Sequence, residues 1–355
     1  MLSFVVRSGR LEPCQKPLPR VRPGWALVRV RLAGICNTDL ELLRGYHNFR
    51  GTPGHEFVGE VVRVGAAPSG SKRGAIRKRW LGRRVVGEIN IACAALGRRE
   101  LCSYCRRSVP THCLRRCVMG IVAHDGAFAE YVCLPLGNLH AVPSSVSDEQ
   151  AVFTEPLAAA CEILEQVPVG EHREAAVLGD GKLAQLVARV LRVAGLRVVM
   201  LGKHPEKLAL ARQAGISAVR ASPARRAAQP RNSHFSLVVE ATGSPEGFKE
   251  AQRLTAPRGT LVLKSTFHGT TPVETWPIVV NELRLVGSRC GSFLQALKLL
   301  RAGRVDPRPL VSRTFPLNEA PAAIRYAQRS GVLKVLLRPT TENAGLSPAD
   351  FFTSG

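Results

Sequence analysis

The sequence predicts an α/β protein of two domains, one rich in β-strands and one built on a doubly wound parallel sheet. Its 355 residues exceed what one ordinary hydrophobic core organises. Residues 1–150 contain short runs that alternate apolar and polar side chains, whereas apolar runs alternate with helical spacing from about residue 151. The hydrophobic content of 45% and the 32 glycines are ordinary for such a protein.

The first part of the chain is expected to form the β-rich domain. A short strand is expected at residues 2–6, and the alternating runs at 25–32 and 57–64 lie between glycine and proline breaks, as half-buried strands do. The segment from Gly65 to Arg79 consists of small and basic residues, so we expect an exposed loop there.

From about residue 151 the pattern predicts strands that alternate with helices. The helix after the first strand is expected to end at Gly195, and Pro205 and Gly215 suit the two ends of the next helix. Right-handed crossovers between such strands produce a parallel sheet. The expected strands lie at residues 175–178, 196–201, 237–240 and 260–263, with a helix starting near Pro245 between the last two.

The net charge of +23 comes from an excess of arginine. Arginines number 40 and lysines 10, and their basic runs are short and scattered along the chain. A nucleic-acid surface concentrates charge on one face and adds aromatic stacking platforms, whereas only 5% of these residues are aromatic. The composition favours a solvated basic surface over a nucleic-acid partner. An anionic substrate or cofactor would also fit this charge.

Composition also indicates the compartment. No apolar run reaches about 18 residues, so no membrane span is expected, and residues 1–7 have the pattern of a strand and lack an apolar signal core. We therefore expect a cytoplasmic protein without membrane association. The ten cysteines argue against a disulfide framework in that compartment, and their clustered spacing favours metal binding.

The turn Gly179-Asp180-Gly181 lies between an expected strand and an expected helix, which is the context of a dinucleotide-binding turn. Glycines let a pyrophosphate approach the helix N-terminus, where free amides and the helix dipole attract it. The third glycine position of this motif holds Ala184, an accepted substitute. A plain tight turn is the alternative. The candidate residues for binding the dinucleotide here are Gly179, Gly181, Lys182 and Leu183.

The end of the second strand of this domain is expected to discriminate between NAD and NADP. A carboxylate there hydrogen-bonds the 2′-hydroxyl of the adenosine ribose and selects NAD. This chain has Gly202, Lys203 and His204 instead, and Arg220 follows the third strand. These cations predict a preference for NADP, with a solvated loop lysine as the alternative interpretation.

Cys102, Cys105 and Cys113 have the spacing of a zinc site, and Cys93 would supply a fourth thiolate. Four sulfur ligands close the tetrahedron, so this site is predicted to be structural. Its zinc would hold a lobe that has little apolar core of its own. A lost or partly oxidised site with Cys117 as a substitute ligand is the alternative.

Cys36, His55 and Glu56 form a second candidate metal set. A catalytic zinc takes about three protein ligands and keeps one position for water or substrate. Asp39 is expected to hydrogen-bond His55 and fix its tautomer, and Thr38 offers a hydroxyl for proton transfer. Each residue alone suits a structural role, but their combination favours a metal. The catalytic candidates are Cys36, Thr38, Asp39, His55, Glu56 and Glu155, the last of which opens the second domain.

Several motifs follow one another along residues 1–338. They are Gly34-Ile35-Cys36-Asn37-Thr38-Asp39, Gly54-His55-Glu56-Phe57-Val58-Gly59-Glu60, the four cysteines, Glu155-Pro156-Leu157, the glycine turn, Glu240-Ala241-Thr242-Gly243 and Val286-Gly287-Ser288-Arg289. In these motifs the chain resembles the zinc-dependent medium-chain dehydrogenases, the family of alcohol, sorbitol and threonine dehydrogenases. The resemblance implies a chaperonin-10-like β-rich catalytic domain at 1–150 and 292–340, a Rossmann domain at 151–291, and a loose tail at 341–355.

The resemblance also implies roles for single residues. Cys36 and His55 match catalytic-zinc ligands, Glu56 matches a glutamate that binds directly or through movement, and Thr38 matches the proton-relay hydroxyl. Glu155 matches the glutamate ligand of the polyol-dehydrogenase branch. The turn from Gly202 to Pro205 matches the phosphate-binding turn of NADP-dependent members. Thr242 and Gly243 match the turn beside the nicotinamide.

Two departures from the family pattern concern Cys93 and Glu41. Eight residues separate Cys93 from Cys102 where the family has two, and Glu41 stands where many members have a histidine at the outer end of the proton relay. The implied function is hydride transfer between an alcohol or polyol and NAD(P), with one catalytic and one structural zinc, in a homodimer or homotetramer. A catalytically silent family member and a basic nucleic-acid-associated protein are the alternatives.

Overall fold

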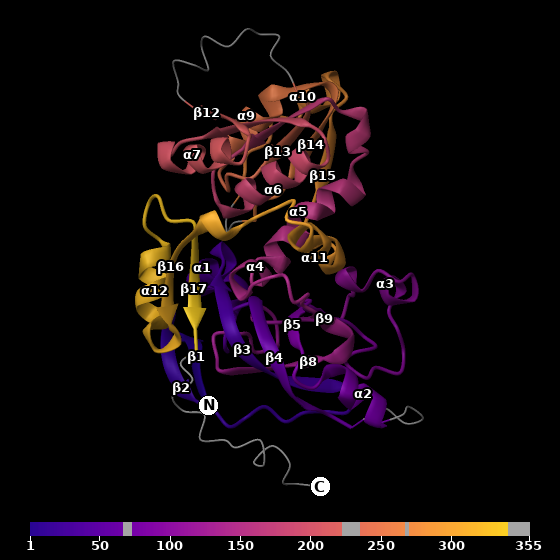
Figure 1. The fold of residues 1–355 in the computed structure, drawn as a ribbon. Helices are drawn as coiled ribbons and strands as arrows, with labels where there is room; N and C mark the ends of the chain where they lie inside the picture. The colour runs from indigo at the N-terminus through magenta and orange to yellow at the C-terminus, as the bar shows by residue number, and fades with distance from the viewer. Residues whose placement is uncertain (67–72, 222–234, 267–269, 340–355) are drawn as a thin grey trace. The chain divides into compact units, whose positions relative to one another are not determined.

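The computed structural model describes residues 1–66, 73–221, 235–266 and 270–339 (Figure 1). Contacts divide the chain into two compact units, Met1–Glu155 with Val311–Gly355, and Pro156–Leu310. The sequence predicts these divisions at 150/151 and 291/292. Residues 67–72 of the loop expected at 65–79 and the tail expected at 341–355 lie outside the described residues. Within the described ranges, no helix is long and apolar enough to cross a membrane.

The first unit is built on a seven-stranded sheet whose central strand, β3, pairs antiparallel with three others. One of these, β17, comes from near the C-terminal end of the described chain, so both ends of the sequence contribute to one sheet, as the resemblance implied. The strands lie in the order β16 (Val311–Pro316), β17 (Lys334–Arg338), β3 (Trp25–Ile35), β4 (Glu56–Val64), β5 (Arg84–Gly87) and β9 (Leu139–Ala141), with β8 (Tyr131–Pro135) beside β3.

Smaller elements complete this unit. The expected N-terminal strand is confirmed as β1 (Leu2–Arg7), which pairs with β2 (Arg10–Gln15), and β6 (Asn90–Ile91) pairs with β7 (Cys117–Val118). The loop expected at 65–79 is wrong in its last part, because α2 begins at Arg73 and its basic last turn suits a helix C-terminus. The helices are α1 (Asn37–Leu43), α2 (Arg73–Trp80), α3 (Ser103–Arg106), α4 (Asp148–Ala151) and α12 (Ala320–Ala327).

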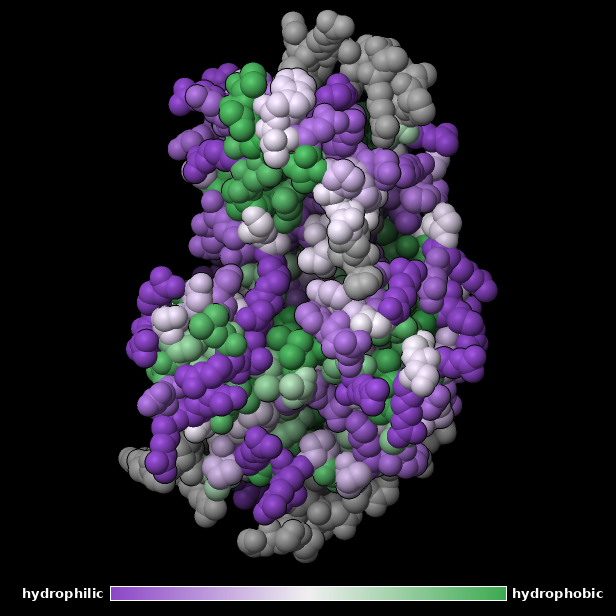
Figure 2. Space-filling view, turned by 180° about the vertical axis from the view of Figure 1, so that it is seen from behind, coloured by the Kyte–Doolittle hydropathy of each residue, from purple (hydrophilic) through white to green (hydrophobic). Residues whose placement is uncertain are grey.

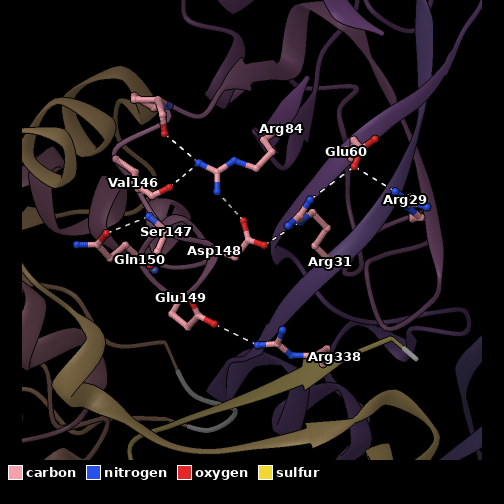
Figure 3. A network of polar contacts seen from close by, with 11 residues as sticks. Arg29, Arg31, Glu60, Arg84, Val146, Ser147, Asp148, Glu149, Gln150 and Arg338 are labelled. Carbon is pink, nitrogen blue, oxygen red and sulfur yellow. Dashed lines mark hydrogen bonds and ion pairs between the residues drawn. The ribbon is translucent and has the colours of Figure 1, made fainter. Parts of the chain in front are cut away.

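Part of the excess arginine charge is neutralised inside this unit (Figure 3). Asp148, the first residue of α4, accepts a hydrogen bond from Arg31 Nε at 2.8 Å and another from Arg84 Nη1 at 2.9 Å. Glu60 pairs with Arg29 at 3.1 Å. The network ties α4 to strands β3, β4 and β5. On the face shown in Figure 2, hydrophilic side chains are spread widely and do not gather in one region.

The second unit contains a six-stranded sheet in which every pair is parallel, as the sequence predicts. The order reverses beside β10, because β11 and β12 lie on one side and β13 to β15 on the other. Dinucleotides bind at the carboxyl ends of strands at such a reversal. The strands are β12 (Ser217–Arg220), β11 (Arg197–Gly202), β10 (Glu174–Leu178), β13 (Phe235–Glu240), β14 (Thr255–Leu263) and β15 (Arg284–Gly287).

The sheet of the second unit buries an apolar core against its helices. Phe248, Ala251 and Leu254 of one helix pack on Val238 and Leu261 of two neighbouring strands. The helices are α6 (Lys182–Val193), α7 (Pro205–Gln213), α9 (Pro245–Leu254), α10 (Trp276–Val280) and α11 (Phe293–Arg301), and α5 (Thr154–Gln166) contains the division between the units.

Candidate active site

Strand register brings three of the candidate residues together beside β3. Gly34 opposes Glu56 across the β3–β4 pair, Cys36 follows the end of β3, and His55 precedes the start of β4. The ligand atoms of Cys36, His55 and Glu56 consequently lie within 4.8 Å of one another. His55 and Glu56 are buried, and Cys36 is half-buried.

Asp39 holds the two segments of this set in place. Its carboxylate is 1% exposed and accepts hydrogen bonds from the backbone amides of Cys36 at 2.7 Å and Gly54 at 3.2 Å. Nδ1 of His55 faces Asp39 Oδ1 at 3.4 Å, close enough for an ion pair but without the alignment of a regular hydrogen bond, so the role of Asp39 in fixing the tautomer stays a prediction.

The environment of His55 changes its affinity for a proton. Burial alone would lower the pKa of His55, but the Asp39 carboxylate and the Cys36 thiol outweigh it and raise the pKa well above 6.5. A metal ligand must be a neutral imidazole, so metal binding at this position would release a proton.

Glu56 is held by Lys334, a residue outside all of the sequence motifs. Lys334 is the first residue of β17 and forms an ion pair with Oε2 of Glu56, and both side chains are 1% exposed. Gly34 lies on β3, between β17 with Lys334 and β4 with Glu56. A Cβ atom at Gly34 would collide with Oε2 of Glu56. Glycine at this position therefore allows the carboxylate of Glu56 to extend over β3 toward the lysine.

The unpaired atoms of this set fit a metal ion. Oε1 of Glu56 is buried without a hydrogen-bond partner, a state that costs about 1–3 kcal/mol unless an ion or water compensates it. Thiolate, imidazole and carboxylate are the ligands that zinc takes in proteins. The hydroxyl of Thr38 lies 3.8 Å from the Cys36 sulfur. Glu155 is half-buried in the first turn of α5 and is not among the gathered ligand atoms, so its role stays a prediction.

The four cysteines of the second cluster have the spacing of a tetrahedral thiolate site. Their sulfurs lie within 4.8 Å of one another, with 3.4 Å between Cys93 and Cys113 and 3.8 Å between Cys102 and Cys113. Four sulfurs about 2.3 Å from a zinc ion would lie about 3.8 Å apart. Cys105 belongs to the same group, whereas Cys117 does not.

The lobe around these cysteines has little else to hold it. Its buried cluster consists of Ala92 and three of the cysteines, with Leu101 and Tyr104 packed alongside. The backbone of Cys105 lowers the pKa of the Cys102 thiol to about 6, so a thiolate is available there at neutral pH. All ten cysteines lie in the described residues, and none forms a disulfide.

The glycine turn connects β10 to α6 at the reversal of the sheet. Gly179 has a φ of +111°, and a Cβ atom there would lie 2.5 Å from the carbonyl oxygen of Ala241. Only glycine fits this conformation and this approach. Gly181 precedes α6, and Lys182 and Leu183 form its first turn, whose amides have no partner within the helix.

The turn after β13 is positioned by a buried carboxylate. Glu240 accepts hydrogen bonds from the backbone amide and the hydroxyl of Thr242, both at 2.6 Å. The amide of Gly243 donates to the hydroxyl of Ser265 at 2.9 Å. Thr242 and Gly243 are exposed at the same carboxyl edge of the sheet as Gly179.

The turn after β11 contains the residues expected to select the cofactor. Gly202 is buried, Lys203 is exposed and His204 is half-buried before the start of α7. Asp180 from the glycine turn accepts hydrogen bonds from the backbone amides of Lys203 at 2.6 Å and His204 at 2.8 Å. The strand end therefore has no carboxylate in its local sequence but receives one in space from Asp180.

Comparison with known proteins identifies the family. The Alcohol dehydrogenase GroES-like domain matches residues 22–144, and the Zinc-binding dehydrogenase domain matches residues 183–302. The chain is 30% identical over 327 residues to D-altritol 5-dehydrogenase of Agrobacterium fabrum, which covers 88% of this chain and 92% of that protein. The chain belongs to the zinc-dependent medium-chain dehydrogenase family.

Solved structures of similar dehydrogenases agree with this assignment. A short chain alcohol dehydrogenase from Escherichia coli, complexed with NADH, matches with a TM-score of 0.84 and 27% identity over 95% of this chain and 99% of that one. A zinc-binding dehydrogenase from Sinorhizobium meliloti, bound to NADP, matches with a TM-score of 0.82 and 28% identity over 96% and 100% of the two chains. The β-rich domain and the dinucleotide-type domain of this dehydrogenase are thus both confirmed.

The stability of this dehydrogenase in acid should depend on Asp180. Burial raises the pKa of Asp180, but hydrogen bonds from His204 and Lys203 outweigh it, so the pKa lies below 3.8. A carboxylate whose pKa is lowered by folding stabilises the protein above its unfolded pKa, and this contribution is lost as the pH falls through the folded pKa.

We expect the Asp180→Asn variant to lose less unfolding free energy than the wild type between about pH 6 and about pH 3. Urea denaturation at a series of pH values measures this difference. Parallel curves for the two proteins would contradict the assigned hydrogen bonds.

Proposed function

We propose that this protein is a zinc-dependent dehydrogenase that interconverts an alcohol or polyol with its aldehyde or ketone, using NAD(P). The observation that carries the proposal is the gathering of Cys36, His55 and Glu56, with one carboxylate oxygen of Glu56 buried and unpaired. Similarity to a D-altritol 5-dehydrogenase supports a polyol as the substrate class.

Each residue of the site has a distinct task in this proposal. Cys36, His55 and Glu56 would hold the zinc, with Glu155 as a further carboxylate ligand. When bound, zinc would supply a Lewis acid for the substrate oxygen, and NAD(P) would supply the hydride acceptor. The hydroxyl of Thr38 takes up the alcohol proton and passes it outward. Asp39 keeps the two ligand segments at a fixed separation through its bonds to backbone amides.

The cofactor and the second zinc are part of the same proposal. We assign NADP as preferred over NAD, supported by Lys203 and Arg220, which have no carboxylate partner among the described residues. Gly179, Gly181, Lys182 and Leu183 would receive the pyrophosphate, and Thr242 and Gly243 would lie beside the nicotinamide. Cys93, Cys102, Cys105 and Cys113 would hold a structural zinc.

A homodimer or homotetramer is proposed as the assembly. Strand β15 lies at the edge of its sheet, where unpaired backbone groups can pair with another chain. Side chains near it are apolar and exposed, with Trp276 at 64%, Val279 at 73% and Val280 at 70%. Such an apolar area suits an interface. Location in the cytoplasm stays a prediction of the sequence.

A screen of alcohols and polyols with NAD and NADP, followed by nicotinamide absorbance, tests the activity. Metal analysis on the same sample should find two zinc ions per chain, and one after Cys36→Ser or after Cys102→Ser. Cys14→Ser is the matched control and should keep both ions. Zinc-free protein that retains full turnover would refute the proposal. Salt-dependent binding of nucleic acid by a protein without turnover would favour the alternative of a basic nucleic-acid-associated protein.

A further inference from the structure

The turn that follows β11 receives a carboxylate from another part of the chain. Asp180 is 7% exposed, and its Oδ2 accepts hydrogen bonds from the amides of Lys203 and His204. The ring Nδ1 of His204 lies 3.1 Å from both carboxylate oxygens. Three donors from one turn therefore converge on a single side chain.

The sequence makes room for this carboxylate by placing glycine at the strand end. A Cβ atom at Gly202 would lie 2.6 Å from both Cβ and Oδ2 of Asp180. A larger residue at position 202 would displace Asp180 from the amides it binds. The glycine turn thus supplies a carboxylate to the turn that follows this strand.

The charges around this turn oppose one another. The side chains of Lys203 and Arg220 are exposed, and Arg220 lies opposite Gly202 in the parallel pairing of β11 and β12. Both cations would attract a 2′-phosphate. The hydrogen bonds keep Asp180 ionised at neutral pH, because its pKa lies below the ordinary value. Its negative charge would repel the same phosphate, and it already occupies two amides that a phosphate could accept from.

We propose that Asp180 limits the preference of this dehydrogenase for NADP over NAD, by opposing the 2′-phosphate of NADP at the turn formed by Gly202, Lys203 and His204. The inference rests on the proposed function, since it requires that a nicotinamide dinucleotide binds at the glycine turn. The proposed NADP preference is then a balance in which Lys203 and Arg220 act against Asp180. Removing the charge of Asp180 shifts that balance toward NADP.

The test compares two probes that differ only in the 2′-phosphate, adenosine 2′,5′-bisphosphate and adenosine 5′-monophosphate. Calorimetry on the full-length protein gives the dissociation constant of the monophosphate divided by that of the bisphosphate, a ratio that rises when the bisphosphate binds relatively more tightly. Asp180→Asn keeps the shape of the side chain and should shift this ratio at least about tenfold in favour of the bisphosphate, a modest value for removing one nearby charge. The ratio of kcat/KM for NADP to that for NAD should shift in the same direction.

Asp306→Asn is the charge-matched control. Asp306 lies in the same unit, where Arg308 binds its carboxylate at 2.8 Å, and the nucleotide ratio should change less than about twofold. Asp180→Ser serves as a second variant if Asp180→Asn does not fold, and it should shift the ratio in the same direction.

The outcomes distinguish a failure of the role of Asp180 from a failure of the proposed function. A ratio that is unchanged or lowered in folded Asp180 variants, while the monophosphate still binds, overturns the role of Asp180 and leaves the proposed function intact. A wild-type protein that binds neither nucleotide overturns both. A raised ratio confined to the Asp180 variants supports the inference.

Discussion

Replacing Cys36 with serine should lower kcat/KM for alcohol oxidation by at least about 10³-fold, or about 4 kcal/mol of transition-state free energy. The reason is that a serine hydroxyl stays protonated at neutral pH and is a much weaker zinc ligand than a thiolate. Among the residues that the structure describes, the thiol is one of three gathered ligand groups, so its loss should leave the site without a metal. Steady-state kinetics with the best substrate of the screen measures this effect.

Two controls give that result its meaning. Cys14→Ser, on β2, removes a thiol that belongs to neither cysteine cluster and should leave kcat/KM unchanged. Binding of NADPH, followed by its fluorescence, should survive in Cys36→Ser because the glycine turn belongs to the other unit. Turnover within about tenfold of the wild type in Cys36→Ser would exclude this thiol as a ligand of a catalytic metal.

Replacing Lys334 with methionine should lower the unfolding free energy of the metal-free protein by about 3–5 kcal/mol. Lys334 and Glu56 are both 1% exposed, so the substitution leaves the carboxylate buried and without its cation. Removal of one partner of a buried ion pair costs far more than the pair contributes when intact. Chemical denaturation of the chelated protein measures the loss.

Zinc should reduce this loss, because an ion at the site would compensate the charge of Glu56. Arg338→Met, on the same strand, is the matched control. Its ion pair with Glu149 is exposed, so we expect a cost of about 0–1 kcal/mol. The double variant Lys334→Met with Glu56→Gln should recover part of the stability. Equal losses of unfolding free energy in Lys334→Met and Arg338→Met would contradict the claim that the buried carboxylate of Glu56 needs the cation of Lys334.

Local patterns were sufficient to predict most of the fold. The spacing of apolar residues predicted the strands and helices of the second unit, because each βαβ crossover is encoded by neighbouring residues. The spacing of the cysteines and of Cys36 with His55 predicted which ligand types would gather. The basic segment at 65–79 was misjudged in its last part, because its charge gave no sign of the helix α2, which begins at Arg73.

Contacts between distant residues explain what the local patterns missed. Lys334 is 278 residues from Glu56, and only the pairing of β17 and β4 with β3 brings them together. A lysine within the apolar run from Val332 to Leu337 was the available signal, since a lone charge in a buried strand needs a partner. Asp180 fills a variable position of its motif, and its bonds to the turn after β11 depend on the pairing of β10 with β11.

Anomalous diffraction at the zinc K edge from crystals of the active enzyme tests the central claim most directly. The account predicts a zinc peak about 2.3 Å from the sulfur of Cys36 and about 2.0–2.1 Å from a ring nitrogen of His55, in addition to a peak among the four cysteines. Active crystals that show zinc among the four cysteines but none between Cys36 and His55 would contradict it.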